Sequence, residues 1–434
     1  MTDGAAARPR FTRSLALSGI SSASAALLLV LYARASDYLS QPEFGLFQYA
    51  LVLASLAETL IDLGMHQITI RAVARDRASA SKLLHNTLTF KGLPAVVVVA
   101  ATAVYLWSTD FASAEGSPAL TADGMRVFCL LMVVSAVPRS YFMTVRGVLL
   151  GLERFGRDTA LVVIDRAALL AAGLLALSAH AGLMGIALVF LLTRTATLVA
   201  ALLVARGLVG RLAINVDTAL WRSLQRSALP VGVFMIVLSF YTYIDTVMLT
   251  HMTTTTETAL YGAAYRLYEG LCYAPSILAA ALSPRLAALW KTDRARHRRL
   301  AYLGLLGAVG LAIALALPVI ALAEPLVTTL FGKAGGPDYA AAAPTLRILA
   351  AGLVFIFPIW ILHSIAISTF REHLLLRTTI VGAIVNVVLN FWLIPARGPD
   401  GAALATVIGE GLCTALLVAG LWTALRRQPA DATV

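Results

Sequence analysis

Charged side chains recur inside long apolar stretches of this sequence, where a charge is costly and is rarely kept without a use. The stretch SFYTYIDTVMLT, residues 239–250, places Asp245 among tyrosines. Arg266 and Glu269 follow in the next apolar run, and a spacing of three puts both on one helix face. We expect Asp245 to have a cationic neighbour, with Arg266 as the first candidate. The three residues predict either a structural ion-pair network or a site where Arg266 exchanges a carboxylate for a phosphate.

Further arginines in the apolar runs suit an anionic partner. A guanidinium group stays charged and offers paired donors to phosphate oxygens, so arginines at several depths fit a head group that bears phosphate. Two of them also fit simpler roles, because Arg146 suits an anchor at the membrane surface and Arg34 a local pair with Asp37. The candidates for binding a phosphate are Arg34, Arg139, Arg146 and Arg266.

Carboxylates in apolar runs are the groups through which transporters couple to protons or Na⁺. Glu58 and Asp62 are four residues apart and share a helix face. Arg194 and Glu410 are 216 residues apart with opposite charges, and a contact between them would form a gate. The sequence does not separate H⁺ from Na⁺ as a coupling ion. The candidates for coupling or gating are Glu58, Asp62, Asp245, Glu269, Arg194 and Glu410.

Residue patterns for catalysis or for a metal are missing from the sequence. Cys129, Cys272 and Cys413 each lie singly in an apolar run, so we expect neither a disulfide framework nor a metal site. His251 has no nucleophile pattern around it, and there is no HExxH motif and no P-loop. We therefore expect no enzyme and no cofactor, apart from a coupling ion.

The composition is that of an integral membrane protein. Of the 434 residues, 59% are hydrophobic and only 13% are charged, whereas soluble domains carry about 25% charged residues. Helices of about 20 apolar residues satisfy their own backbone groups in lipid, so the runs predict an all-α fold. The twelve expected spans are 14–36, 43–72, 82–107, 122–150, 157–178, 183–206, 224–250, 257–290, 299–323, 339–370, 374–393 and 401–425.

Basic residues give the expected topology. The net charge of +11 comes largely from short loops between apolar runs, including Arg222 and Arg226, which is an orientation signal and not a nucleic-acid surface. The distribution places both termini in the cytoplasm of a multi-pass protein. We expect five parts along the chain: a tail 1–13, a lobe 14–206, a linker 207–223, a lobe 224–425 and a tail 426–434.

The two halves of the chain repeat. GLMGIAL before the sixth span matches GPDGAAL before the twelfth, so that Gly182 and Gly398 are 216 residues apart. Gly45 and Gly262 sit in similar stretches 217 residues apart. Six spans in each half make the halves parallel repeats, and transporters of this kind bind substrate between their halves.

Several stretches resemble one family in its own order. They are SQPEFGLFQYALVLASLAETLIDLG at residues 40–64, FYTYIDTVMLT followed by ALYGAAYRLYEGL at 240–271, and IVNVVLNFWLIPARGPDGAALATVIGE at 384–410. Together they resemble the Wzx-type polysaccharide biosynthesis flippases of the multidrug/oligosaccharidyl-lipid/polysaccharide exporter (MOP) superfamily. The resemblance implies a MATE-like fold of two six-helix lobes around a central cavity. Asn386 and Asn390 match its NVVLN motif, and hydrogen bonding between helices is their expected role.

The resemblance also implies a function. Such proteins move lipid-linked oligosaccharides, usually on a polyprenyl pyrophosphate, from the cytoplasmic to the outer leaflet of the bacterial cytoplasmic membrane. Expected partners are this substrate, membrane lipids, a polysaccharide polymerase and glycosyltransferases. Two alternatives stay open: a cation-coupled multidrug exporter of the same superfamily, and a scaffold that assembles the polymerase and glycosyltransferases.

Overall fold

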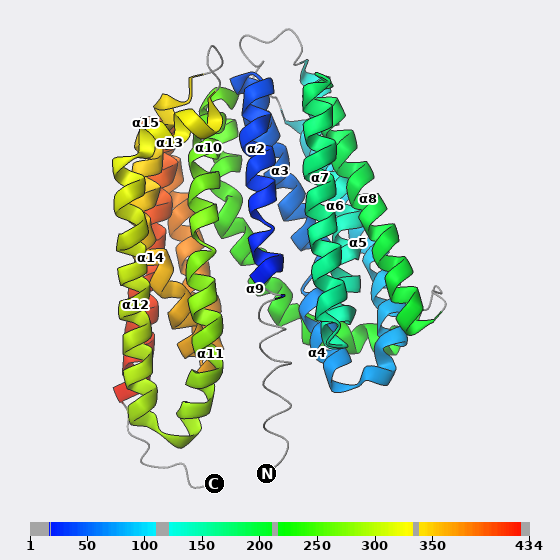
Figure 1. Ribbon diagram of the computed structural model, residues 1–434, viewed down its shortest axis with the longest axis vertical. Coiled ribbons are helices and arrows are strands. Elements are labelled where there is room, and N and C mark those ends of the chain that lie inside the picture. The colour runs from blue at the N-terminus through cyan, green and yellow to red at the C-terminus, as the bar shows by residue number, and fades with distance from the viewer. Residues whose placement is uncertain (1–16, 18, 110–120, 211–215, 333–337, 427–434) are drawn as a thin grey trace. The chain divides into compact units, whose positions relative to one another are not determined.

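Apolar helices make up the part of the chain that the computed structural model describes, which is residues 17, 19–109, 121–210, 216–332 and 338–426 (Figure 1). Within these ranges there is no strand, and eleven helical stretches are long and apolar enough to cross a membrane. The last stretch, Glu372–Trp422, is interrupted at Gly398 and so holds two of the expected spans. The count therefore agrees with the twelve expected, and the protein is an all-α, multi-pass membrane protein.

The chain forms two compact units, 1–243 with 254–259 and 244–253 with 260–434. The division passes through α9, whereas charge patterning placed a linker at 207–223. The first unit holds α2 (Ala26–Tyr38), α3 (Gln41–Asp62), α4 (Met65–Arg75), α5 (Ala80–Ser108), α6 (Ala122–Gly151), α7 (Phe155–Ser178), α8 (Gly182–Val209) and the first part of α9 (Thr218–Met252). The second holds most of α10 (Thr255–Leu271), then α11 (Ala274–Thr292), α12 (Arg294–Ala321), α13 (Ala323–Phe331), α14 (Ala343–Ser368) and α15 (Glu372–Arg426).

Burial of apolar side chains explains why α9 begins in unit 1. Leu224 and Ala228, one helical turn apart, are buried in a core cluster with side chains of α4, α5, α6 and α8. Leu149 and Phe142 of α6 are fully buried in the same cluster. Each such side chain contributes roughly 1.5–3 kcal/mol when removed from water, so packing holds the first part of α9 to unit 1.

Two expected spans are broken in the structure. The run 43–72 was predicted as one span, but α3 ends at Asp62, and Leu63 and Gly64 both adopt positive φ, of 49° and 78°, before α4 begins. The run 257–290 also divides, into α10 and α11, although Tyr273 between them has a φ of −74°. The apolar pattern continues through both breaks, so hydropathy alone does not reveal them.

The backbone confirms the internal repeat. Gly182 and Gly398 were paired by sequence, and both take positive φ, of 62° and 52°. Side chains other than glycine pay an energetic cost there, so each half keeps glycine at the turn that precedes its last span. Arg194 and Glu410 follow these glycines at the same distance along the chain and therefore occupy matching positions on α8 and α15.

Gly45 lies where two backbones meet inside unit 1. A Cβ atom at this position would stand 1.7 Å from the carbonyl oxygen of Thr255. We expect Gly45→Ala to lower the free energy of unfolding by about 1–3 kcal/mol, because the Thr255 backbone cannot move aside as a flexible side chain does. Thermal unfolding of the purified protein measures this. Gly207→Ala on α8 is the matched control, since nothing lies within 4 Å of its added Cβ; equal melting temperatures for the two variants would contradict the prediction.

Candidate functional site

Asp245 on α9 is the centre of a buried polar cluster in unit 2. Its side chain is 1% exposed and accepts hydrogen bonds from the Tyr261 hydroxyl at 3.1 Å, from Asn390 Nδ2 at 2.6 Å and from the Thr406 hydroxyl. Asn390 Nδ2 also donates to Asn386 Oδ1 at 3.1 Å. We call these five residues the Asp245 cluster. It joins α9 and α10 to both halves of α15.

The expected pair of Asp245 with Arg266 is wrong. Arg266 binds Glu269 instead, at 2.7 Å and one turn away on α10. Neutral donors surround Asp245, and no Lys, Arg or His of the described ranges forms an ion pair with it. The spacing of three that places Arg266 and Glu269 on one face also lets them satisfy each other locally. Asp245 is thus a buried carboxylate without a fixed counter-ion.

Two amide atoms of the Asp245 cluster are buried without a partner in the described chain. Asn390 Oδ1 is buried and has no hydrogen-bond partner within the described chain, and Asn386 Nδ2 is also unpaired there. Buried amide groups normally find a partner, so the cluster has hydrogen-bonding capacity to spare. A carboxylate, two amides and a hydroxyl are the hard oxygen ligands that suit Na⁺, and the carboxylate alone suits a proton.

Glu410 lies on the second half of α15 and is 4% exposed. The Tyr268 hydroxyl donates to its Oε1, while its Oε2 is buried and has no partner within the described ranges. Arg194, at the matching position of unit 1, donates to the Ser135 hydroxyl at 3.0 Å and stands over the Phe190 ring. Each of the two residues therefore has a partner inside its own unit, and a gate formed by both stays a prediction.

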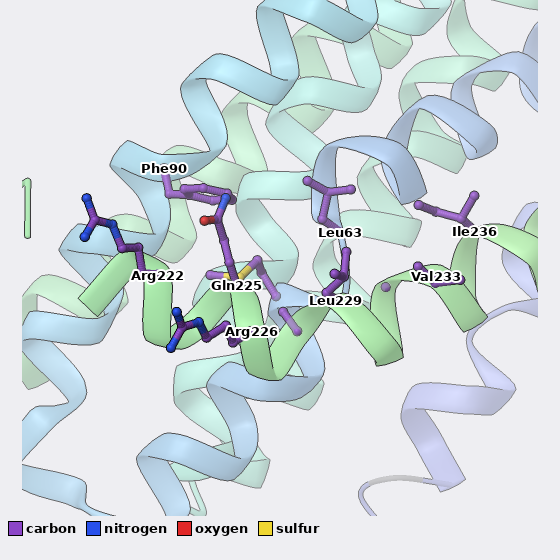
Figure 2. A pocket seen from close by; sticks show the side chains of 11 residues that line it. Leu63, Phe90, Arg222, Gln225, Arg226, Leu229, Val233 and Ile236 are labelled. Atoms are coloured by element: carbon purple, nitrogen blue, oxygen red, sulfur yellow. The ribbon is translucent and has the colours of Figure 1, made fainter. Parts of the chain in front are cut away.

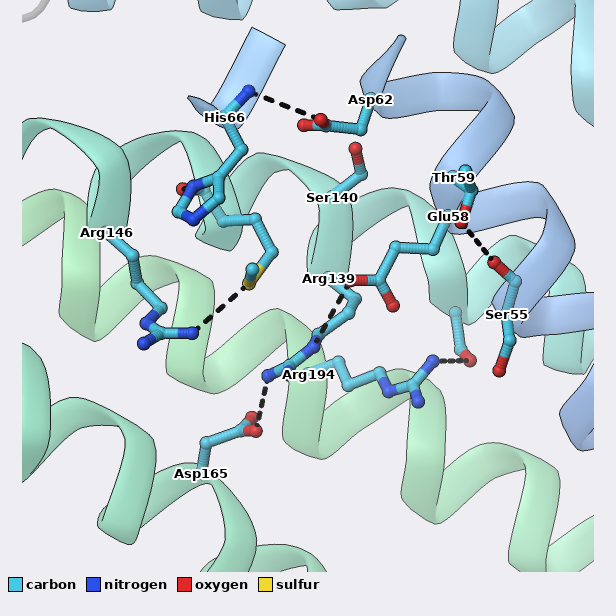
Figure 3. A network of polar contacts seen from close by, with 12 residues as sticks. Ser55, Glu58, Thr59, Asp62, His66, Arg139, Ser140, Arg146, Asp165 and Arg194 are labelled. Carbon is cyan, nitrogen blue, oxygen red and sulfur yellow. Dashed lines mark hydrogen bonds and ion pairs between the residues drawn. The ribbon is translucent and has the colours of Figure 1, made fainter. Parts of the chain in front are cut away.

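Unit 1 contains a second polar network, drawn in Figure 3. Arg139 on α6 approaches Glu58 on α3 at 3.6 Å and Asp165 on α7 at 2.8 Å. The Thr197 hydroxyl donates to the other oxygen of Asp165. Figure 3 shows Arg194 beside this group, with its guanidinium pointing away from Asp165. No carboxylate of the described chain forms an ion pair with Arg194, so this is the arginine in the network most open to an added anion.

Arg146 forms the second ion pair between α6 and α7. Its Nε and Nη2 donate to the two oxygens of Asp158 at 2.7 and 3.1 Å, a paired geometry typical of a strong ion pair. Asp158 and Asp165 are seven residues apart, as are Arg139 and Arg146, so antiparallel helices bring the pairs together in order. This matched seven-residue spacing of acidic and basic residues is the signal in the sequence that points to Asp158 and Asp165. Neither carboxylate was among the candidates.

Lys91 is a further buried charged residue that was not among the candidates. It is fully buried on α5, and its Nζ donates to Asp62 at 2.6 Å and to the Ser140 carbonyl and hydroxyl oxygens at 2.8 and 3.1 Å. Asp62 also accepts from the His66 backbone amide at 3.2 Å, across the break between α3 and α4. A lysine inside an apolar run was the available signal. Glu58 and Asp62 thus both have cationic partners, which favours a structural role for Asp62.

Arg34 is the most exposed candidate. It pairs with Asp37 at 3.0 Å on the same helix while 63% of its side chain is exposed, which is the simpler of its two expected roles. No cluster of three or more His, Cys, Asp or Glu side chains that would hold a metal ion occurs in the described ranges. In unit 1 the structure thus gathers Glu58, Arg139 and Arg194 into one group, the Arg139 network. In unit 2, Glu410 and the Arg266–Glu269 pair have partners outside the Asp245 cluster, and Arg34 lies outside both groups.

Comparisons with known proteins agree with this fold. Residues 12–290 match the polysaccharide biosynthesis protein family, and residues 230–392 match the MatE family. An inward-facing multidrug resistance MATE transporter of the MOP superfamily aligns with a TM-score of 0.76 at 17% identity, over 94% of this chain and 96% of its own. The lipid II flippase MurJ aligns with a TM-score of 0.65 at 13% identity, over 90% of this chain and 87% of its own.

Two further proteins are also similar. A MOP superfamily transporter of Pyrococcus furiosus has a TM-score of 0.68 and 15% identity, over 96% of each chain. An uncharacterized membrane protein of Methanocaldococcus jannaschii is 28% identical over 168 residues, which are 38% of this chain. The chain spans 32% of that relative's length. At these identities the solved structures show the fold alone.

Proposed function

Because the chain belongs to the polysaccharide biosynthesis protein family, we propose that it moves a polyprenyl-pyrophosphate-linked oligosaccharide from the cytoplasmic to the outer leaflet by alternating access. It is a multi-pass transporter of the MOP superfamily, and the proposal adds the substrate and the direction. The membrane is the bacterial cytoplasmic membrane, with both termini in the cytoplasm. Likeness in fold to the lipid II flippase MurJ supports a lipid-linked cargo.

The observation that carries this proposal is the arginine pair of unit 1. Arg139 shares two carboxylates, Glu58 and Asp165, and Arg194 has a hydroxyl partner in place of a carboxylate. A pyrophosphate would bind Arg194 without displacing an acidic side chain. It would bind Arg139 once that arginine releases Glu58, the more distant of its two carboxylate partners. Arginines repel the cationic compounds that many drug exporters carry.

A coupling cation is part of the proposal. The Asp245 cluster offers a buried carboxylate and the side-chain oxygens of Asn386, Asn390 and Thr406, one of them unpaired. Protonation of Asp245, or Na⁺ held by these oxygens, would remove the cost of a buried charge without a counter-ion. Arg146 and Arg266, each paired with a carboxylate, serve the fold in this scheme.

Depletion of the protein tests the proposed substrate. We expect one polyprenyl-linked glycan to accumulate in depleted cells, because its synthesis continues while its export stops. Mass spectrometry of extracted lipids detects it and gives the sugar composition by mass. Restoring the wild-type chain is the control and should clear the intermediate. Unchanged lipid-linked glycans and unchanged surface polysaccharide, in a strain without a second flippase, would contradict the proposal.

A cation-coupled multidrug exporter is the second candidate. It is favoured by the match of residues 230–392 to the MatE family and by the TM-score of 0.76 with a MATE transporter. Drug susceptibility separates the two candidates. An exporter predicts that depleted cells become sensitive to cationic compounds with no change in lipid-linked glycans, whereas a flippase predicts the reverse.

A further inference from the structure

A cavity of about 380 Å³ lies in unit 1 where α9 passes the junction of α3 and α4 and Phe90 of α5. Figure 2 shows its arrangement: Arg222 and Arg226 extend at one end, and Leu229, Val233 and Ile236 line the other. Leu63 and Phe90 close the side opposite α9 (Figure 2). The residues of this α9 pocket thus separate into a basic end and an apolar trough. Pockets of this size, mostly apolar with a few polar groups, are typical of small-molecule sites.

The first turns of α9 lie outside the hydrocarbon core. The helix has 35 residues, which at 1.5 Å per residue is about 52 Å, while the core is about 30 Å thick. In Figure 1 this part of α9 runs crosswise to the helices of unit 1 before the chain turns upward. Pro230 lies inside α9, and proline inside a helix allows a bend. The segment carrying Arg222 and Arg226 is therefore placed at the membrane surface, with its buried side fixed by Leu224 and Ala228.

Both arginines are open to an anion. They are four residues apart, so they share one side of the helix, and both are exposed. No carboxylate of the described ranges forms an ion pair with either. The nearest acid in sequence, Asp217, is held by Lys82 at 2.7 Å. The hydrogen bonds from Lys82 and from the Leu220 backbone amide lower the pKa of Asp217, so it stays ionised and bound to the lysine.

Apolar surface beside these arginines is also uncovered. Leu229 is 64% exposed and Val233 is 38% exposed on the turns that follow Arg226. Trp221 packs its ring on Phe90 with centroids 5.7 Å apart, and aromatic side chains of this kind favour the interface of a membrane. A ligand that fits must carry a negative charge at one end and an apolar chain at the other.

We propose that the α9 pocket binds an anionic phospholipid of the cytoplasmic leaflet, with its phosphate between Arg222 and Arg226 and an acyl chain along Leu229 and Val233. Two guanidinium groups can share the phosphate oxygens in paired hydrogen bonds. Basic pockets between helices on the cytoplasmic side bind lipid head groups in this way. The site is separate from the Asp245 cluster and from the Arg139 network, so it stands apart from the proposed cargo.

Native mass spectrometry of the full-length protein tests the site, with phosphatidylglycerol, phosphatidylcholine and undecaprenyl phosphate as probes. We expect wild-type protein to retain phosphatidylglycerol over phosphatidylcholine, and R222Q/R226Q to lose that retention at least fivefold. The matched control is R298Q/R299Q, which removes the same charge from exposed positions of α12 and should retain the lipid. Val233→Trp keeps the charge but fills the trough, and should also weaken retention.

Two results would overturn the proposal. One is equal retention of phosphatidylglycerol by wild type, R222Q/R226Q and Val233→Trp. The other is retention of undecaprenyl phosphate that depends on Arg222 and Arg226, without retention of phosphatidylglycerol. That result would assign the α9 pocket to the polyprenyl carrier. Melting temperatures of all variants show whether each is folded. If R222Q/R226Q does not fold, retention of phosphatidylglycerol by Val233→Trp tests the proposal.

Discussion

Asp245→Asn is expected to lower the rate of cargo flipping at least tenfold while the protein stays folded. Asparagine has the shape of aspartate, and its oxygen can accept from Asn390 while its amide group donates to the Thr406 hydroxyl, which keeps its own bond to the Ala402 carbonyl, so the packing around it changes little. It cannot take up a proton, and it carries no charge to hold Na⁺. The coupling step would therefore be lost, whereas the hydrogen-bonded frame of the cluster would remain.

Asp245→Ala should behave differently. It would leave the Tyr261 hydroxyl without its acceptor and would remove one of two acceptors from Asn390 and from Thr406, and an unsatisfied buried group costs about 1–3 kcal/mol. We therefore expect this variant to unfold at a lower temperature as well as to lose transport. Comparing the two variants separates a role in coupling from a role in holding α9 to α15.

The measurement is flipping in proteoliposomes with an imposed Na⁺ or pH gradient. Wild type should respond to one of the two gradients, which identifies the ion, and Asp245→Asn should respond to neither. Asp123→Asn is the matched control, because it removes a carboxylate that is 82% exposed and should leave the rate unchanged. A rate for Asp245→Asn that equals wild type and still follows the gradient would remove Asp245 from coupling.

The spans could be read from the sequence because burial in lipid requires long apolar runs. The predicted run 122–150 and the observed α6, Ala122–Gly151, differ by one residue. The breaks after α3 and α10 escaped prediction because the apolar pattern continues through the positive φ at Leu63 and through the end of α10. The turn at Gly398 was found only because a second copy, at Gly182, marked the same place in the other half.

The sequence shows which charged residues lie in apolar runs, but it does not show which residues they contact. Asp245 was singled out correctly as a buried charge, but its partners Asn390 and Thr406 are 145 and 161 residues away. Sequence spacing reports neighbours on one helix and is silent on contacts between distant helices. It therefore favoured Arg266 for Asp245, although Arg266 was closer to Glu269 on its own helix face.

Lys91→Met is expected to lower the free energy of unfolding by about 3 kcal/mol, the lower end of the range for breaking a buried ion pair. Lys91 is 0% exposed and its partner Asp62 is 18% exposed, so removal of the ammonium leaves a largely buried carboxylate without its cation. Methionine fills nearly the same space, so loss of packing contributes little. Denaturation in mixed micelles measures the free energy.

A double variant distinguishes the charge from the shape of the side chain. Lys91→Met combined with Asp62→Asn should recover a large part of the loss, because asparagine accepts from the His66 backbone amide without a net charge. Lys82→Met is the matched control: Lys82 is 56% exposed in its pair with Asp217, and exposed pairs contribute about 0–1 kcal/mol. If Lys91→Met were as stable as Lys82→Met, the buried pair would not hold the fold together, and Asp62 would return to the candidates for coupling.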